Sequence, residues 1–227
     1  MRHLLLLSCC LHIGCFTSVI SSFDSAYLPQ KGQVQARAYS TNNLGVFTSE
    51  NTGGQRHFGA AAGVGLSNRL TLTAQWERAG RDRRLQIEGT EGYQSYRYFE
   101  GGILVGLIDK KLATHVSYGR YMTDQGELLQ VIRPKMMYTF KSPRRKMEFS
   151  LHMQYLRSLY VRTVEDLDLS DVIFGQNFAI SNDLDRWRAI IDLSSSAKGI
   201  LSAGLGVEYR FGGGKTNLEL VRTFKVE

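Results

Sequence analysis

Hydrophobic and polar residues alternate along most of this chain, and segment 70–77 shows the pattern clearly. In that segment Leu72 and Trp76 fall on one face of an extended backbone, while Thr71 and Thr73 fall on the other. Alternation with a period of two residues is typical of β-strands whose two faces meet different surroundings. Because the same period recurs from position 34 almost to the end of the chain, we expect an all-β protein.

The alternating segments predict ten strands. Their ranges are 34–40, 58–66, 70–80, 99–107, 112–122, 131–140, 148–155, 187–193, 201–211 and 217–225. Four connections are short, at 67–69, 109–111, 141–146 and 194–199, and three are long, at 42–55, 81–94 and 161–185. Short turns at one end and long loops at the other are typical of outer-membrane barrels. We therefore predict an antiparallel up-and-down transmembrane β-barrel of about ten strands, with eight as the alternative, and we expect the short turns to face the periplasm.

The first twenty residues differ in composition from the rest. Arg2 and His3 form a short basic start, and an apolar run follows from Leu4. This arrangement resembles a secretory signal peptide. We therefore divide the chain into a signal peptide at 1–22 and a barrel domain at 23–227. No later apolar run approaches the roughly 20 residues that a membrane helix needs.

The end of the signal peptide has two alternatives. The stretch 11–15, LHIGC, loosely resembles a bacterial lipoprotein cleavage site, which would place cleavage before Cys15 and a lipid on its sulfur. The other alternative is ordinary cleavage after the small residues Ser21 or Ser22. All three cysteines lie at positions 9, 10 and 15. The remaining chain therefore has no disulfide, although export would bring it into a disulfide-permissive compartment.

The formal net charge of +7 does not point to nucleic acid. Basic residues are scattered singly along the predicted strands and turns, and they cluster only at 81–84 and 141–146. A nucleic-acid site needs a basic patch or stripe. We expect anionic neighbours of another kind, namely outer-membrane phospholipids and lipopolysaccharide.

Alternation alone does not show whether the apolar face meets lipid or a protein core. A soluble lipocalin-like barrel alternates too, with its apolar face inward. Aromatic residues near the predicted strand ends favour lipid, because membrane barrels carry aromatic girdles at both interfaces. These residues are Trp76, Phe99, Tyr118, Tyr138, Phe140, Phe149, Trp187, Tyr209 and Phe211. In lipid no sheet edge can stay unpaired, so the barrel must close, and Pro134 fits such a sheet only at a bulge or a strand end.

The opposite face carries charged residues of both signs. They are Arg37, Glu77, Glu100, Arg133, Lys135, Glu148, His152, Arg188, Asp192, Glu208 and Arg210. The lumen of a ten-stranded barrel is narrow, and a charge inside it is costly unless it is paired. We therefore expect these side chains to pair across the lumen and to fill it, rather than to line a path for ions or solutes.

Candidate catalytic chemistry is sparse. His57, His115 and His152 lie in separate predicted strands without the spacing of metal ligands, so we expect no metal or other cofactor. His115 and Ser117 share one face, with Glu127 near the same predicted end, and an outer-membrane lipid A deacylase uses a His/Ser/acid set of this kind. However, both residues face the predicted lumen, whereas a lipid hydrolase needs its site on the lipid side. A non-enzymatic barrel is therefore the preferred interpretation.

Three stretches resemble a family of small, porin-like Gram-negative outer-membrane β-barrel proteins. Segment 29–41, PQKGQVQARAYST, is similar to the family's first strand, and segment 60–77, AAAGVGLSNRLTLTAQWE, is similar to its hairpin. Segment 203–211, AGLGVEYRF, resembles the aromatic-ended strand that the barrel-assembly machinery reads. The chain departs from that pattern because sixteen residues follow Phe211, so either a last strand with Phe224 carries the assembly signal or the remainder is a tail. The resemblance implies location and fold more than activity.

These observations together predict a surface-exposed outer-membrane barrel without enzymatic activity. Its long outward loops at 42–55, 81–94 and 161–185 would be available to an extracellular ligand. The barrel-assembly machinery and the membrane lipids are its other expected partners. The alternatives are a lipid-modifying outer-membrane hydrolase that uses His115 and Ser117, and a soluble periplasmic barrel that binds a ligand.

Overall fold

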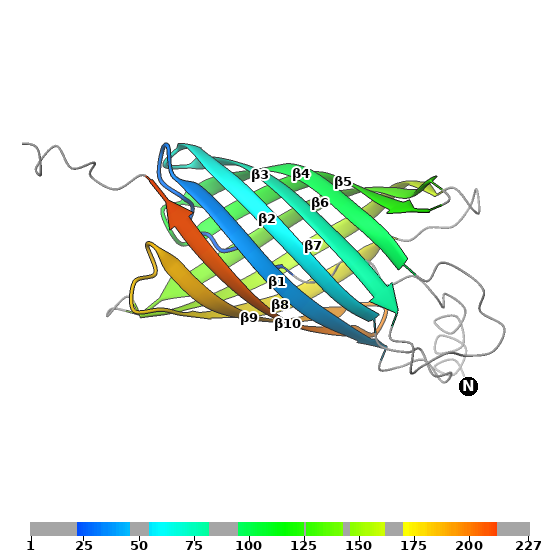
Figure 1. Ribbon diagram of the computed structural model, residues 1–227. Helices are drawn as coiled ribbons and strands as arrows, with labels where there is room; N and C mark the ends of the chain where they lie inside the picture. Colours follow the sequence, from blue (N-terminus) through cyan, green and yellow to red (C-terminus); the bar gives the residue numbers. More distant parts are fainter. Residues whose placement is uncertain are drawn as a thin grey trace, which may run out of the picture.

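Ten β-strands close into one barrel within the part of the chain that the structure describes (Figure 1). This computed structural model describes residues 22–45, 55–81, 95–124, 126–142, 146–161 and 170–212. The strands are β1 (Val34–Gly45), β2 (Gln55–Ser67), β3 (Leu70–Arg81), β4 (Ser95–Ile108), β5 (Leu112–Thr123), β6 (Gly126–Lys141), β7 (Met147–Val161), β8 (Asp171–Ile180), β9 (Trp187–Ser196) and β10 (Ile200–Phe211). No helix among the described residues is long and apolar enough to cross a membrane.

Each strand pairs antiparallel with its neighbours in the sequence, and the first strand pairs with the last. The β1–β10 ladder runs from Val34 opposite Phe211 to Gly45 opposite Ile200. Because this ladder joins the two ends of the sheet, no strand is left with a free edge. The predicted antiparallel up-and-down barrel of ten strands is confirmed.

One of the ten strands is not among those predicted. β8 lies inside the interval 161–185, for which the sequence predicted a long loop, and that prediction is wrong. Both faces of β8 are mixed in character, since its inward face includes the apolar Ile173 and its outward face includes the polar Gln176. Such mixing weakens the two-residue period on which the prediction relied. The predicted strand at 217–225 lies outside the described residues.

The extra strand changes which end of the barrel carries each turn. We call the end at which β1 begins and β10 ends the near end, and the opposite end the far end. The near end carries the turns 68–69, 109–111, 142–146 and 181–186, and the far end carries the connections 46–54, 82–94, 124–125, 162–170 and 197–199. The sequence placed the turn 194–199 with the other short turns. That placement is wrong, because the β9–β10 turn lies at the far end.

Side chains alternate between an apolar outer wall and a polar interior. On β3, Leu72 and Trp76 are 45% and 41% exposed, whereas Thr71 and Glu77 are fully buried. The other described strands repeat this alternation, with large apolar side chains outside and most of the charged ones inside. A soluble barrel places these two classes the other way round, whereas a membrane barrel turns its apolar residues outward.

Aromatic side chains gather on the outer wall toward both ends. Those toward the near end are Tyr138, Phe140, Phe149, Trp187, Tyr209 and Phe211, and those toward the far end are Phe58, Trp76, Phe99, Tyr118 and Phe174. At the near end the rings touch in pairs, with 4.6 Å between the centroids of Tyr138 and Phe140 and 4.6 Å between those of Tyr209 and Phe211. Two such belts are typical of barrels that span a bilayer.

Pro134 lies on the outward face of β6 at a gap in the sheet. It stands opposite Val116 of β5, but on the other side the ladder with β7 resumes only at Lys135 after a pair at Ile132. Proline has no N–H to donate to a ladder. The ladder between β6 and β7 is therefore interrupted at the residue that has no N–H to donate.

Candidate functional site in the barrel interior

A segment of the chain that precedes β1 occupies the interior of the barrel. This N-terminal segment comprises residues 22–33, and Phe23 and Ala26 within it are 3% and 1% exposed. Phe23 packs against Tyr39 of β1, with ring centroids 4.8 Å apart. The backbone N–H of Ala26 donates to Thr139 Oγ1 of β6 at 2.8 Å. Since β1 and β6 stand on opposite sides of the closed sheet, the segment lies across the lumen (Figure 1).

A tight turn at the near end connects the N-terminal segment to β1. Gly32 has a φ of 75°, a left-handed conformation that glycine adopts without steric cost. Its N–H donates to the Gly65 carbonyl at 2.8 Å, and the Gln33 N–H donates to the Gln30 carbonyl at 2.9 Å. The turn reverses the chain, so that a segment inside the barrel continues into a strand of its wall.

Asp24 joins the N-terminal segment to strands around the lumen. Its carboxylate pairs with Arg37 of β1, with 3.1 Å between Nη1 and Oδ1, and with the ammonium group of Lys135 on β6. His115 Nδ1 of β5 lies 3.7 Å from Oδ2. Asn177 of β8 donates its side-chain N–H to the Asp24 carbonyl at 2.8 Å. Strands β1, β5, β6 and β8 therefore converge on one residue of the segment.

The surroundings of Asp24 act on its pKa in opposite directions. Asp24 belongs to the N-terminal segment rather than to a strand, and its burial alone would raise its pKa. Lys135 and Arg37 favour the carboxylate more strongly, so the pKa of Asp24 lies well below its usual value. The residue is therefore an anion at neutral pH, and it compensates cations that would otherwise be buried with too few partners.

Glu208 of β10 forms a second centre of charge, and three arginines surround it. Arg37 Nη2 lies 2.8 Å from its Oε2, and Arg188 Nη2 and Arg210 Nε lie 2.9 and 3.0 Å from its Oε1. Arg188 Nη1 also lies 2.6 Å from Glu148 Oε1. One planar guanidinium can serve two carboxylates in this way. The cluster thereby connects β1, β7, β9 and β10 through buried ion pairs.

Two further pairs lie beside β3 and β4. Arg133 pairs with Glu100, which also accepts a hydrogen bond from the Tyr98 hydroxyl. Toward the far end, His57 Nδ1 lies 2.5 Å from Glu77 Oε1. All five side chains are inside the barrel, with Glu77, His57 and Tyr98 fully buried. Buried carboxylates in this part of the lumen thus have donors within reach.

Tyr27 occupies the near end of the lumen. Its hydroxyl donates to Asp185 Oδ1 at 2.6 Å, and its backbone carbonyl accepts from Arg210 Nη2 at 2.7 Å. The ammonium nitrogen of Lys141 lies 3.7 Å from the centre of its ring, which is within the range of a cation–π contact. The N-terminal segment is therefore held by Asp24 near the start of the segment and by Tyr27 at the near end of the barrel.

Two glycines of β10 make room for the aromatic side chain at the start of the segment. A Cβ at Gly204 would lie 2.7 Å from Phe23 Cζ, and a Cβ at Gly206 would lie 3.1 Å from Phe23 Cδ1. Any larger side chain at these positions would collide with the ring or displace it. The small inward residues of β10 thus belong to the seat of the N-terminal segment.

The charged residues that the sequence placed in the lumen are all buried inside the barrel. Five of them form the cluster around Glu208, and Arg133 and Glu100 pair with each other. That cluster consists of Arg37, Glu148, Arg188, Glu208 and Arg210. The remaining members of the predicted set contact other side chains. Lys135 and Glu77 pair with Asp24 and His57, while His152 and Asp192 both lie near the hydroxyl of Ser194, at 3.4 and 3.0 Å.

Sequence reasoning missed several partners in this interior, chiefly Asp24, His57 and Tyr98. His57 could have been found, because it lies two residues from Gly59 on a strand and therefore shares its inward face. Asp24 offered no such signal, since the stretch 22–33 does not alternate. Its role depends on the segment lying inside the barrel, which local pattern does not encode.

The alternative catalytic set is not brought together. His115 Nε2 lies 2.8 Å from Thr73 Oγ1, and the Ser117 hydroxyl donates to the Arg133 carbonyl at 3.4 Å. Glu127 stands opposite Met122, seven residues along β5 from His115, which is about 23 Å at the usual rise of a strand. The structure therefore places the acid far from the proposed base and nucleophile, which contact other groups.

Several predicted features lie largely outside the described residues. These are the signal peptide, with the lipidation candidate Cys15, and most of the loops 42–55 and 81–94. The described parts of those two loops belong to strands, because β1 continues to Gly45 and β3 to Arg81. The proposal of an extracellular ligand at the loops therefore rests on the sequence.

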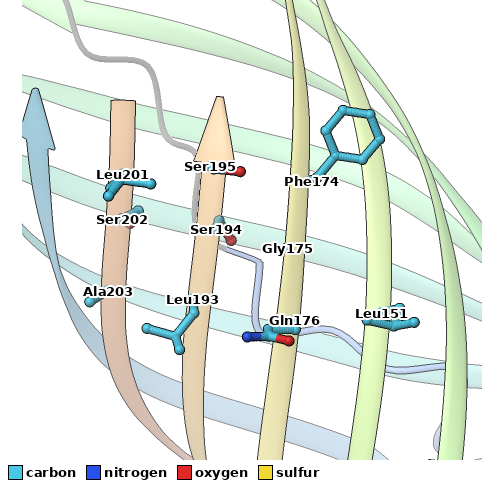
Figure 2. Close-up of a pocket in the computed structure, with 10 residues that line it drawn as sticks. All are labelled: Leu151, Phe174, Gly175, Gln176, Leu193, Ser194, Ser195, Leu201, Ser202 and Ala203. Carbon is cyan, nitrogen blue, oxygen red and sulfur yellow. The ribbon is translucent and has the colours of Figure 1, made fainter. Parts of the chain in front are cut away.

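A hollow lies on the outer wall, across β7, β8, β9 and β10 (Figure 2). Its volume is about 570 Å³, and its lining includes Leu151, Phe174, Leu193 and Leu201, all of which are exposed. Figure 2 shows the Gln176 side chain between those of Leu193 and Leu151. This hollow is a groove in an apolar surface, and it contains no charged side chain among its lining residues.

Comparisons with known proteins give architectural likeness without a family. No family model matches the sequence, and no curated protein matches it. The N-terminal β-barrel domain of Pseudomonas aeruginosa OprF is similar at 14% identity and a TM-score of 0.38, over 80% of this chain and 98% of that one. The translocator domain of the autotransporter NalP from Neisseria meningitidis shows 11% identity and a TM-score of 0.40, over 92% and 94%. The KdgM porin shows 10% identity and a TM-score of 0.40, over 79% and 99%.

Those identities and TM-scores are low. By their names, these structures are β-barrel proteins of the same broad class that the sequence resembles. The assignment of the fold itself rests on the strand pairing described above.

Proposed function

We propose that this protein is an outer-membrane β-barrel whose lumen is closed by its own N-terminal segment. It would expose its far end at the cell surface and act there as a structural or binding protein rather than as an enzyme or an open pore. The observation that carries the proposal is the distribution of side chains, with an apolar outer wall surrounding a charged interior.

The outer wall is suited to hydrocarbon rather than to water. Leu72, Phe99, Leu205 and Val207 are 45%, 47%, 66% and 57% exposed, and similar side chains surround the barrel. Each square ångström of apolar surface left in water costs roughly 25 cal/mol. A closed sheet without free edges is also one of the two architectures that can cross a bilayer. A soluble ligand-binding barrel would need the opposite arrangement of faces.

The residues inside the lumen support the proposal that the pore is closed. The N-terminal segment lies across it, and Asp24 and Tyr27 bind strands on several sides. The buried arginines around Glu208 occupy the wall beside the segment. A conducting pore needs a continuous path of water, and these ion pairs and the segment stand in that path.

The near end is assigned to the periplasm. β1 begins and β10 ends there, and its turns are short. Outer-membrane barrels have short periplasmic turns and longer extracellular loops. The far end, with the connections 46–54 and 82–94, would then face outward and be available to a ligand.

The proposal is tested by asking which face of a strand meets lipid. Cysteines at Leu72 and Thr73, in a full chain whose three natural cysteines are replaced by serine, would each carry a spin label in lipid vesicles. We expect a lipid-soluble relaxation agent to reach the label at 72 and to be excluded from the label at 73. Folded protein should also migrate faster on a denaturing gel before heating than after it.

The opposite outcome is equally clear. A sample prepared without detergent or lipid that remains monomeric and folded, with the label at 72 shielded, would contradict a membrane barrel.

A further inference from the structure

Charged side chains on the outer wall gather toward the far end of β2 to β5. Arg56, Arg78, Arg97 and Arg120 lie on these four consecutive strands, and all four are exposed. Arg78 stands directly opposite Arg97 in the β3–β4 register. Elsewhere on the outer face of the described strands, charged residues are rare, and Arg157 of β7 is one of them. The four residues Arg56, Arg78, Arg97 and Arg120 are called the arginine cluster below.

The arginine cluster carries an excess of positive charge. Like charges directly opposite each other on a sheet destabilise it. Among the described residues, Arg120 has an acidic neighbour, Glu127, with 3.6 Å between the charged atoms, and it also donates to the Tyr118 hydroxyl at 3.1 Å. No ion pair joins Arg56, Arg78 or Arg97 to a described carboxylate. The guanidinium groups of the cluster are therefore available to bind an anion that does not belong to the described chain.

The height of the cluster on the wall matches a lipid headgroup. Arg78 lies eight residues beyond Leu70, the first residue of β3 at the near end. With the usual rise per residue and strand tilt, this places it roughly 20 Å up the barrel, close to the upper edge of an apolar band about 25 Å tall. Charge on the lipid face of a barrel costs little at that level and much more at the midplane.

The wall beneath the cluster is hollowed. Ala36, Ala62, Ala74 and Gly101 occupy one row across β1 to β4, because each stands opposite the next in the register. They lie in a groove of about 710 Å³ that Trp76, Phe99 and Tyr118 flank. Small side chains between aromatic ones leave a shallow apolar channel, and that shape fits hydrocarbon chains.

We infer that the arginine cluster and this groove bind a bisphosphorylated acylated glycolipid of the outer leaflet, of the lipid A class. The phosphates would bind the guanidinium groups, and acyl chains would lie in the groove. Guanidinium binds phosphate through two parallel hydrogen bonds and is weakly hydrated, which favours arginine at such a site. This inference rests on the proposed function, because it needs the far end to face the outer leaflet.

The width of the cluster favours two phosphates over one. It extends over three strand-to-strand spacings, from β2 to β5, which is about 14 Å. A single phosphodiester headgroup would reach only part of that width. A disaccharide that carries a phosphate toward each end would engage arginines on both sides of the Arg78–Arg97 pair.

The test compares a double variant with a matched control. Native mass spectrometry of the folded full-length protein in detergent would be titrated with bisphosphoryl lipid A, monophosphoryl lipid A and phosphatidylglycerol. We expect R78Q/R97Q to lose at least tenfold in affinity for bisphosphoryl lipid A. The R157Q control removes an outward arginine from β7, which is two strands beyond β5 and outside the cluster, and should change that affinity less than twofold. Wild type should bind monophosphoryl lipid A and phosphatidylglycerol several-fold more weakly.

Other results would overturn the inference. Equal losses in R78Q/R97Q and R157Q would show that no local site exists, and equal affinity for phosphatidylglycerol would show that the site does not select a bisphosphorylated glycolipid. Heat-modifiable migration and insertion into vesicles are measured on the same samples. Wild type that inserts without a lipid preference overturns this inference alone, whereas wild type that does not insert overturns the proposed function.

Discussion

Asp24 shows how one side chain can hold a stretch of backbone without helix or strand inside the barrel. Without it, Lys135 would have no carboxylate partner among the described residues, and Arg37 would retain only Glu208. Removing one partner of a buried ion pair is strongly destabilising because the other charge stays buried. The carboxylate at position 24 therefore affects both the seating of the N-terminal segment and the stability of the barrel.

The substitution Asp24→Asn tests this role with little change in shape. We expect it to lower the free energy of unfolding by about 3 kcal/mol, since it leaves buried cations uncompensated. Urea unfolding in lipid vesicles, followed by the fluorescence of the two tryptophans, would measure the change.

The control for this variant is Asp109→Asn, in the exposed turn between β4 and β5. An exposed substitution of this kind should alter stability by less than about 0.5 kcal/mol. Equal effects at the two positions would contradict a special role for Asp24.

The lowered pKa of Asp24 gives a second prediction. Its stabilising contribution is present above the unfolded pKa of about 3.9 and is lost as the pH falls through the lower folded value. The stability difference between wild type and Asp24→Asn should therefore stay constant from about pH 8 to pH 5 and shrink below about pH 4. A difference that already disappears near pH 6 would contradict the assignment, and the same urea titrations at several pH values would detect it.

At the scale of elements, two-faced strands could be predicted from the sequence because lipid and lumen impose opposite demands on alternate residues. β10 satisfies both demands along its whole length, and β3 does so from Leu70 to Glu77, so their patterns are clear. β8 satisfies them only in part, with the apolar Ile173 inside and Gln176 outside. Its position in the barrel is determined by pairing with β7 and β9, which the local pattern does not record.

The local sequence pattern is also limited in what it predicts about the interior of the barrel. The inward charges of the strands followed from alternation, but their partners did not. Asp24 lies close to Lys135 only because the N-terminal segment runs inside the barrel and the chain reverses its direction at Gly32 to begin β1. A contact of this kind depends on the closed fold, so it could not be read from spacing along the sequence.

The strand that the pattern missed can be verified directly. Cysteines placed at Phe174 and Ile173, in the same cysteine-free full chain, should behave oppositely, because the first side chain is 51% exposed and the second is buried. A lipid-soluble quencher should reduce the fluorescence of a label at 174 at least threefold more than that of a label at 173. Equal quenching, as expected for a loop, would contradict β8.

At the scale of the whole molecule, the interior decides whether the barrel conducts. A barrel of ten strands has a narrow lumen, and the N-terminal segment and the surrounding ion pairs occupy it. In planar bilayers the wild type should therefore show few or no conductance steps. The triple variant Phe23→Ala, Asp24→Asn, Tyr27→Ala removes the three anchors of the segment and should produce frequent openings.

The matched control is Phe58→Ala with Asp109→Asn, since both residues are exposed on the outside of the barrel. It should remain as silent as the wild type. If the wild type conducts as often as the triple variant, the N-terminal segment does not close the pore.

The ladder between β1 and β10 also fixes the order in which the molecule can be assembled. Its strands come from opposite ends of the described sequence, so their meeting carries the largest entropy of loop closure in the sheet and comes late. Until then both strands keep an unpaired edge, and a chain in that state is prone to join with others. The N-terminal segment is continuous with β1 and must be inside before this seam is sealed. The pairing of β1 with β10 thus encloses the N-terminal segment, so the wall of the barrel and the segment inside it reach their final positions in the same step.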